Sequence, residues 1–186
     1  GTIEDVAEAY ISIGFQQEGD SIYVLGTLKE EVGSSSYVYH YHNIEKSPAP
    51  YVNLDEELAL QTVVLDLISQ KLIQSAHDIS DGGLAFTLLE SGFVHGLGAE
   101  ISCPSDMRKD AFLFGEGGGR VVVSVNATAE AAFENVLNGA DFPYLKLGTV
   151  SSGAVQVDDE KMGSIAELKG TYQGAIGKYM IPALQE

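Results

Sequence analysis

The stretch SAHDISDGGLA, residues 75–85, decides how this 186-residue sequence is interpreted. Two carboxylates, Asp78 and Asp81, lie three residues apart, with a hydroxyl between them and two glycines behind them. The glycines let another backbone or a ligand approach closely, and the helix expected after them presents unpaired N–H groups that form an anion site. Because Asp81 would repel a bare phosphate, a magnesium ion held by Asp78 or Asp81 would resolve the conflict. The structural alternative is that Ser80 or Asp81 caps the helix and the glycines permit the turn.

Outward from this polar break over residues 76–83, apolar spacing predicts the helices. Leu58, Leu65 and Leu72 recur near helical spacing, together with Val64 and Ile68. Acidic residues at the start of that segment suit the positive end of a helix, and Thr128 is the expected N-cap of a later one. The expected helices cover residues 54–73, 84–95, 128–137 and 163–180, with one or two further turns over 2–10.

Short β-rich runs bounded by turn residues predict the strands. They cover residues 21–26, 99–103, 120–125, 144–150 and 154–157, and the tyrosine-rich segment 37–42 is also expected to be extended. The turn at 151–153 separates the last two strands, and 47–50 form a rigid, proline-rich connector. Helices and strands therefore alternate, which favours an α/β or α+β domain whose sheet is covered by helices.

Composition limits the partners that this chain can take. Ten Lys and Arg against 27 Asp and Glu give a formal net charge of −17, a poor surface for nucleic acid or for an anionic membrane. The single cysteine, Cys103, excludes an internal disulfide and a cysteine-based zinc cluster. Neither a membrane span nor a signal peptide is visible, so we expect a cytoplasmic protein. Because Gly1 stands where Met is usual, we expect a processed product or a piece of something larger.

Other candidate sites are weaker. The glycine loop GEGGGR, residues 115–120, lacks the Lys-Ser/Thr of a P-loop and runs into a strand, so it either cradles a phosphate or turns a hairpin. His40 and His42 would share one face of a strand, but a catalytic zinc needs a third protein ligand. His77 and Asp78 are a candidate acid–base pair. Against this, neighbouring residues of a strand point to opposite faces.

The wording of residues 75–85, followed by Glu90, closely resembles the signature of the phosphoribosylformylglycinamidine synthase family. The resemblance extends over about residues 20–157. The further segments that carry it are the strand-end Gly26, a Gly-Ser-x-x-Tyr stretch at 33–37, a proline-led helix entry at 50–57, and a Gly-Glu-…-Arg strand at 114–123.

This resemblance implies a fold and a domain organisation. The fold is the three-layer α/β/α C-terminal domain, with partial ferredoxin-like topology, that aminoimidazole ribonucleotide synthetase shares with selenophosphate synthetase, thiamine-monophosphate kinase and a hydrogenase maturation factor. The family's synthases carry two copies of an N-domain plus C-domain unit, and the wording here resembles the second copy. We therefore expect residues 1–186 to be a single C-terminal domain of a larger chain, with 1–20 as a connecting segment and 21–186 as the domain.

The resemblance also implies an activity, an ATP-dependent C–N ligation in purine biosynthesis. ATP activates the formamide oxygen of formylglycinamide ribonucleotide, and ammonia displaces phosphate. ATP and Mg²⁺ are the implied cofactors, and the implied partners are the N-terminal domains of the parent chain and a glutaminase that supplies ammonia. Because the family's catalytic histidine lies in an N-domain, we expect no catalytic residue here and no activity from this chain alone. The alternative is a non-catalytic structural or interaction domain of a related ATP-dependent synthetase, of the hydrogenase maturation or selenophosphate type.

In the first copy of the family's unit, the matching Asp is a magnesium ligand and a Glu-Ser-Gln triplet contacts substrate. The resemblance therefore implies Asp78 as the metal ligand of a second, pseudo-equivalent site. Two glycines replace Ser and Gln in this chain, which removes side-chain donors, so we expect weak binding and a mainly structural role. The implied ligand-binding residues are His77, Ser80, Asp81, Gly82, Gly83, Glu116, Gly117, Gly118 and Arg120.

Overall fold

A seven-stranded mixed sheet forms the middle layer of the computed structural model, which describes residues 10–180. The strand order is β2-β4-β1-β5-β3-β6-β7. All but the last residue of the helical turns expected over 2–10 lies outside the described residues. The strands are β1 (Ser21–Leu25), β2 (Ser75–Asp78), β3 (Leu97–Ile101), β4 (Val121–Val125), β5 (Tyr144–Ser152), β6 (Ala154–Val157) and β7 (Glu160–Ser164).

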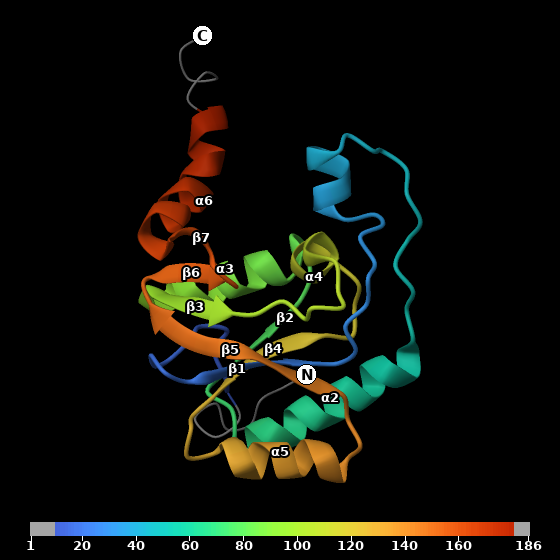
Figure 1. Cartoon of the computed structure of the whole chain (residues 1–186), viewed down its shortest axis with the longest axis vertical. Coiled ribbons are helices and arrows are strands. Elements are labelled where there is room, and N and C mark those ends of the chain that lie inside the picture. Colours follow the sequence, from blue (N-terminus) through green and yellow to red (C-terminus); the bar gives the residue numbers. More distant parts are fainter. Residues whose placement is uncertain (1–9, 181–186) are drawn as a thin grey trace.

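Helices cover both faces of this sheet (Figure 1). They are α2 (Leu54–Ser69), α3 (Gly83–His95), α4 (Lys109–Phe114), α5 (Glu130–Gly139) and α6 (Ile165–Met180), with one π-helical turn, η1 (Tyr37–Tyr41). No helix among residues 10–180 is long and apolar enough to cross a membrane.

The central strand β1 separates the two largest clusters of the apolar core, because its side chains alternate between the faces. Ile22 and Val24 pack in a cluster that includes residues of α3 and α4. Tyr23 and Leu25 pack in the other cluster, with residues of α2 and α5. All five residues of β1 are buried, as expected for a strand between two helical layers. The expected three-layer α/β/α domain is thus confirmed.

The expected boundaries hold best where the residues are apolar or where glycine ends an element. Gly96 ends α3 in the left-handed conformation (φ 73°), as a C-terminal glycine should. By contrast, β5 and β6 are not paired across the turn at 151–153, because β3 lies between them, antiparallel to β5 and parallel to β6. The expected helix over 54–73 ends at Ser69, since Lys71 takes a positive φ of 56°.

Three elements are absent from the sequence-based interpretation, and one cap is wrong. The strand β2 overlaps the expected polar break over 76–83, because the polar His77 and Asp78 at its end hide the strand pattern. The short helix α4 and the strand β7 are the other two. Thr128 does not cap α5, which begins at Glu130 without a side-chain cap. Instead, the side chain of Asn126 accepts hydrogen bonds from the Thr128 N–H and hydroxyl.

The segment expected to be extended over 37–42 is instead the helical turn η1. The Ser35 carbonyl accepts the Tyr39 N–H at 3.0 Å, and the rings of Tyr37 and Tyr41 stack 5.4 Å apart at 11°. Residues four apart share a face in a strand as well as in a helix, but in a strand they lie about 13 Å apart, too far for their rings to stack. The prediction that His40 and His42 share one face of a strand is therefore wrong as well. Figure 1 shows η1 raised above the sheet, at the top of the long connection between β1 and α2.

Gly26 ends β1 against the glycine loop, and we expect its substitution to be costly. Its φ is +97°, and a Cβ there would collide with the Gly119 carbonyl oxygen. Gly26→Ala should lower the free energy of unfolding by about 2 kcal/mol or more, because left-handed strain and a backbone clash act together. Gly118→Ala is the matched control, since a Cβ at Gly118 meets nothing within 4 Å. Urea unfolding measures both variants, and equal losses would contradict the expectation.

Candidate functional site

The turn between β2 and α3 is built from two glycines in the left-handed conformation. Gly82 has a φ of 82° and Gly83 a φ of 68°, and a Cβ on Gly83 would come within 2.7 Å of the Leu113 carbonyl oxygen. Gly82 is the N-cap residue of α3, and the helix has no side-chain capping hydrogen bond. The hypothesis that Ser80 or Asp81 caps the helix is therefore wrong.

One oxygen of Glu116 holds this turn from across the molecule. Glu116 Oε1 accepts the Gly82 N–H at 2.7 Å and the Ser36 N–H at 2.9 Å. These donors come from the start of α3 and from the segment that leads into η1, whereas Glu116 itself lies in the glycine loop. The carboxylate thus ties together three parts of the chain, each far from the others in sequence.

The glycine loop is held in turn by the buried guanidinium of Arg120. Its Nε donates to the Gly117 carbonyl at 3.0 Å, and its Nη2 donates to the Gly115 and Gly117 carbonyls at 2.9 Å each. Arg120 is only 3% exposed. Burial lowers the pKa of its guanidinium, against the opposite influence of the Glu31 carboxylate. The loop joins α4 to β4, so the hairpin hypothesis is wrong.

A cavity of about 340 Å³ brings six of the ten expected site residues together. Two α2 residues, Glu57 and Leu60, complete one side of it. His77, Gly83 and Gly117 do not line this cavity or the two neighbouring ones described next, and Gly82 lines only the aromatic one. The six expected residues that line it are Asp78, Ser80, Asp81, Glu116, Gly118 and Arg120.

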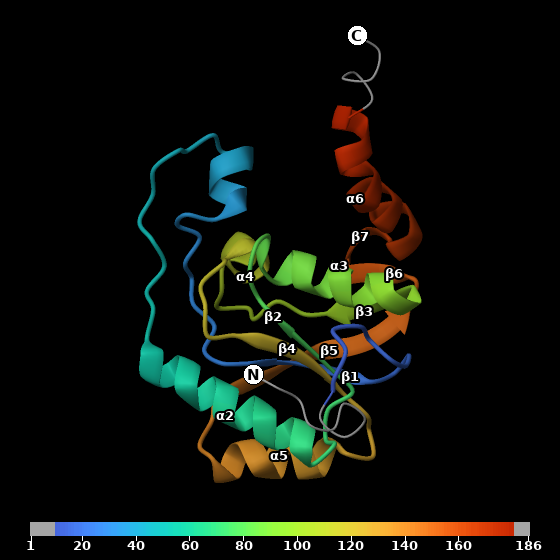
Figure 2. The ribbon, with the colours of Figure 1, turned by 180° about the vertical axis from the view of Figure 1, so that it is seen from behind.

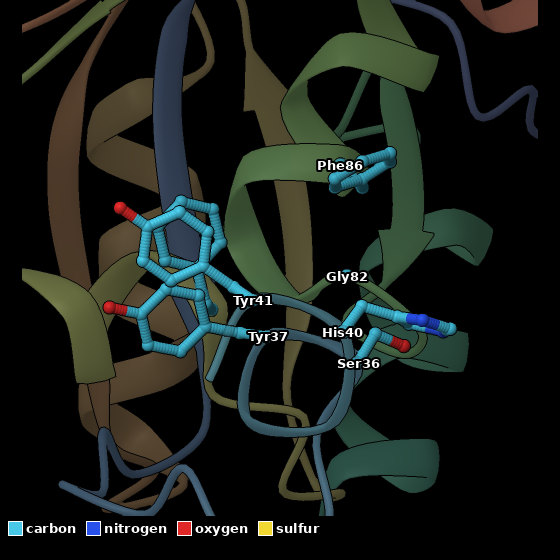
Figure 3. A pocket seen from close by; sticks show the side chains of 7 residues that line it. Ser36, Tyr37, His40, Tyr41, Gly82 and Phe86 are labelled. Atoms are coloured by element: carbon cyan, nitrogen blue, oxygen red, sulfur yellow. The ribbon is translucent and has the colours of Figure 1, made fainter. Parts of the chain in front are cut away.

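An aromatic pocket of about 560 Å³ lies between η1 and the start of α3 (Figure 3). Tyr37 stacks between Tyr41 and Phe114, with ring centroids 5.4 and 4.8 Å away. In Figure 3, His40 points away from the tyrosines, and Phe86 lies above Gly82. On the His40 side of η1 is a third cavity of about 520 Å³, which Asp81 and Glu116 also line.

Sequence reasoning missed the aromatic pocket because it treated residues 37–42 as a strand. The available signal was the pair Tyr37 and Tyr41, four residues apart and directly after three serines. The middle serine, Ser35, is buried, and its hydroxyl oxygen accepts the Val38 N–H at 3.3 Å. Such serine-to-backbone bonds are typical at the start of a helical turn.

His77 does not line the 340 Å³ cavity but is connected through Glu90 to the helix α6. Its Nε2 is 3.0 Å from Glu90 Oε2, and Glu90 Oε1 accepts the Tyr172 hydroxyl at 2.6 Å. His77 Nδ1 is 3.4 Å from Asp78 Oδ1, without hydrogen-bond geometry. The two neighbouring side chains are thus closer than an ideal strand would place them, but His77 is engaged with Glu90. This network fixes β2 to α3 and α3 to the closing helix.

Asp78 and Asp81 could supply only some of the ligands that a magnesium ion needs. Asp78 has a side chain that is 72% exposed, and Asp81 is exposed on the same cavity. Magnesium often takes one or two protein carboxylates and completes its shell with water and phosphate oxygens. Between residues 10 and 180, no three or more His, Cys, Asp or Glu side chains are placed to hold a metal, so His40 and His42 do not belong to such a group.

We expect Glu116, not Asp81, to govern stability at this site. Glu116→Ala leaves the Ser36 and Gly82 N–H groups without their acceptor and should cost about 2 kcal/mol or more. Glu116→Gln keeps an acceptor oxygen and should cost less. Asp81→Ala removes no cap and should stay within about 0.5 kcal/mol of the wild-type chain. Urea unfolding at neutral pH distinguishes the three variants. A loss in Asp81→Ala equal to that in Glu116→Ala would refute this assignment.

Comparison with known proteins gives one family. The family model described as the C-terminal domain of AIR synthase related proteins matches residues 17–159. Among curated relatives, phosphoribosylformylglycinamidine synthase subunit PurL of Alkaliphilus metalliredigens is 34% identical over 180 residues, covering 95% of this chain and 24% of that protein. The Salinibacter ruber subunit PurL is 37% identical over 189 residues, covering 95% and 25%. The chain therefore spans about a quarter of the length of these relatives.

Solved structures show the same fold at low identity. Thermotoga maritima PurL complexed with ATP has a TM-score of 0.66 and 14% identity, covering 85% of this chain and 27% of that chain. The same protein complexed with FGAR has a TM-score of 0.65, at 14% identity, covering 85% and 29%. The resemblance first seen in residues 75–85 is confirmed, and this chain belongs to the family of AIR synthase related proteins, with the C-terminal domain fold of that family.

Proposed function

We propose that this chain is the second-copy C-terminal domain of a phosphoribosylformylglycinamidine synthase, a cytoplasmic enzyme that converts formylglycinamide ribonucleotide to formylglycinamidine ribonucleotide. The observation that carries the proposal is identity above 30% to subunits of that name over 95% of the chain. Residues 1–186 then form one domain, with 1–20 leading into it. The chain itself works as part of a larger ATP-dependent C–N ligase.

The charged residues of the cavity would determine which ligand can bind there. Asp78 and Asp81 would hold a magnesium ion through their carboxylate oxygens, and the ion would offset their charge toward a phosphate. In the parent enzyme, bound ATP would supply the activation of the formamide oxygen. The Gly82 N–H, the first donor at the start of α3, is already taken by Glu116. A phosphate at this turn would therefore meet a carboxylate where an open donor is expected, and it would need the cation.

A mainly structural role for this second-copy site has specific support. Glu116 Oε1 and the Nε and Nη2 atoms of Arg120 make their hydrogen bonds within the chain, whereas Arg120 Nη1 is buried without a partner among residues 10–180. Four carboxylates and one guanidinium, that of Arg120, line the 340 Å³ cavity, and the excess of negative charge opposes an unaccompanied phosphate. The four are Glu57, Asp78, Asp81 and Glu116. Substrate turnover would then rest on the N-terminal domains of the parent chain, with ammonia supplied by a glutaminase.

The isolated chain should be inactive, because catalysis needs groups held in one geometry and no catalytic residue is assigned here. Purified chain, incubated with ATP, magnesium, ammonia and formylglycinamide ribonucleotide, should release no ADP above background. The full-length synthase of a close relative is the positive control. Turnover by the isolated chain would contradict the proposal.

Ligand binding by the isolated chain should be weak, and Gly118 should limit it. Gly118 lines the 340 Å³ cavity and has open space around it, so Gly118→Gln would add an amide donor beside a bound ligand. A Cβ on the buried Gly117 would instead face Glu31 and Arg120, so Gly117→Ser should add little. One new hydrogen bond is worth about 1 kcal/mol, or about fivefold in affinity.

Calorimetry with ADP and magnesium tests this difference. We expect weak or undetectable binding by the wild-type chain, a gain in Gly118→Gln and in the double variant Gly117→Ser/Gly118→Gln, and no gain in Gly117→Ser alone. Micromolar binding by the wild-type chain would show a competent site and overturn the structural role. Equal gains in both single variants would overturn the assignment of Gly118.

A further inference from the structure

The helix α2 has two apolar faces, and only one of them packs on the sheet. Leu60, Val63 and Leu67 are at most 8% exposed and belong to the core shared with α5. Leu54 and Leu58 remain 77% and 65% exposed, and Leu65, further along, 67%. At about 100° per residue, these three leucines fall within roughly 40° of one another around the helix. Figure 2 shows α2 along the outside of the molecule, beside α5.

This outer face continues into the segment before the helix. Tyr51 and Val52 are 62% and 66% exposed. We call the five residues Tyr51, Val52, Leu54, Leu58 and Leu65 the outer stripe. Single exposed apolar residues are normal on protein surfaces, but several large ones along one element mark an interaction site. A spacing of four and then seven residues between leucines is also the pattern that helix pairs use in their contact seam.

The charges beside the outer stripe indicate its partner. Between Leu54 and Ser69 the sequence has four acidic residues and no Lys or Arg. A second copy of this chain would bring these acidic groups against themselves, at a net charge of −17 per chain. An anionic membrane is disfavoured for the same reason. An apolar surface flanked by Lys and Arg is complementary. The four acidic residues are Asp55, Glu56, Glu57 and Asp66. At about 100° per residue, Asp55, Glu57 and Asp66 lie beside the leucines, whereas Glu56 lies on the opposite face. Glu56 pairs with Lys29, whose ammonium also lies over the Tyr51 ring.

We propose that the outer stripe of α2 docks an amphipathic helix of a partner protein segment, with an apolar stripe flanked by Lys or Arg. Leu58 and Leu65 are the central contacts. Asp55 and Asp66 select the basic flank on one side of the leucines, and Glu57 lies on the other side. The proposal does not depend on nucleotide binding or on the ligation reaction.

A pair of synthetic helices of about 21 residues, or three heptads, tests the proposal. Both peptides carry leucine at positions a and d. One has lysine at e and g, and the other has glutamate. Fluorescence anisotropy should show that the wild-type chain binds the lysine peptide at least tenfold more tightly than the glutamate peptide. Leu58→Ser/Leu65→Ser should lower the affinity for the lysine peptide at least tenfold. It should not lower Tm, because both side chains are exposed. The exposed Ala59→Ser is the control and should bind as the wild-type chain does.

Charge reversal and sedimentation complete the test. Asp55→Lys/Asp66→Lys should lower the affinity for the lysine peptide and raise the affinity for the glutamate peptide. If Leu58→Ser/Leu65→Ser keeps full affinity, binding reflects net charge alone and the proposal fails. Failure of the wild-type chain to bind the lysine peptide also refutes it. A wild-type dimer in sedimentation equilibrium that becomes monomeric in Leu58→Ser/Leu65→Ser would assign the stripe to a second copy and overturn the partner named here.

Discussion

A single carboxylate oxygen, Glu116 Oε1, fixes the geometry of the site. It accepts the N–H groups of Ser36 and Gly82, which come from segments 80 and 34 residues away in sequence. Hydrogen bonds to a charged acceptor are worth about 1.5–3 kcal/mol each, more than ordinary ones. Arg120 binds two carbonyls of the same glycine loop and so helps to hold Glu116 in place. The position of η1, the start of α3 and the three cavities around them all follow from these contacts.

The same arrangement limits what the site can bind. A helix N-terminus attracts anions through its open N–H groups, yet here the chain supplies its own anion to the first of them. The charge of Glu116 remains in the cavity beside Asp78 and Asp81. A nucleotide phosphate would thus need a cation to offset these carboxylates. This is the physical basis of our proposal that the site is mainly structural.

Sequence reasoning succeeded where local residue types decide the outcome. The apolar runs of β1 and β4 and the terminal Gly96 of α3 needed no long-range information. Six of the ten expected site residues line the 340 Å³ cavity, but they were chosen through the wording of a family signature, and their role in binding stays a prediction. The roles of Glu116 and Arg120 could not be predicted, because their partners are set by tertiary contacts. Tyr37 and Tyr41 were misassigned because aromatic residues favour strands in general, while their stacking requires a helical turn.

Periodicity failed in a more instructive way on α2. Leu58 and Leu65 have helical spacing, but so do Leu60, Val63 and Leu67, and a pattern of apolar residues does not say which stripe faces the sheet. The structure buries the second set and exposes the first. Glu57, next to Leu58, lines the 340 Å³ cavity, and a Cβ on Gly119 would lie 3.8 Å from its carboxylate. One helix therefore presents its apolar side to the core, a carboxylate to the site and a second apolar side to solvent. A partner seated on the outer stripe would lie against the same helical turn that closes the site.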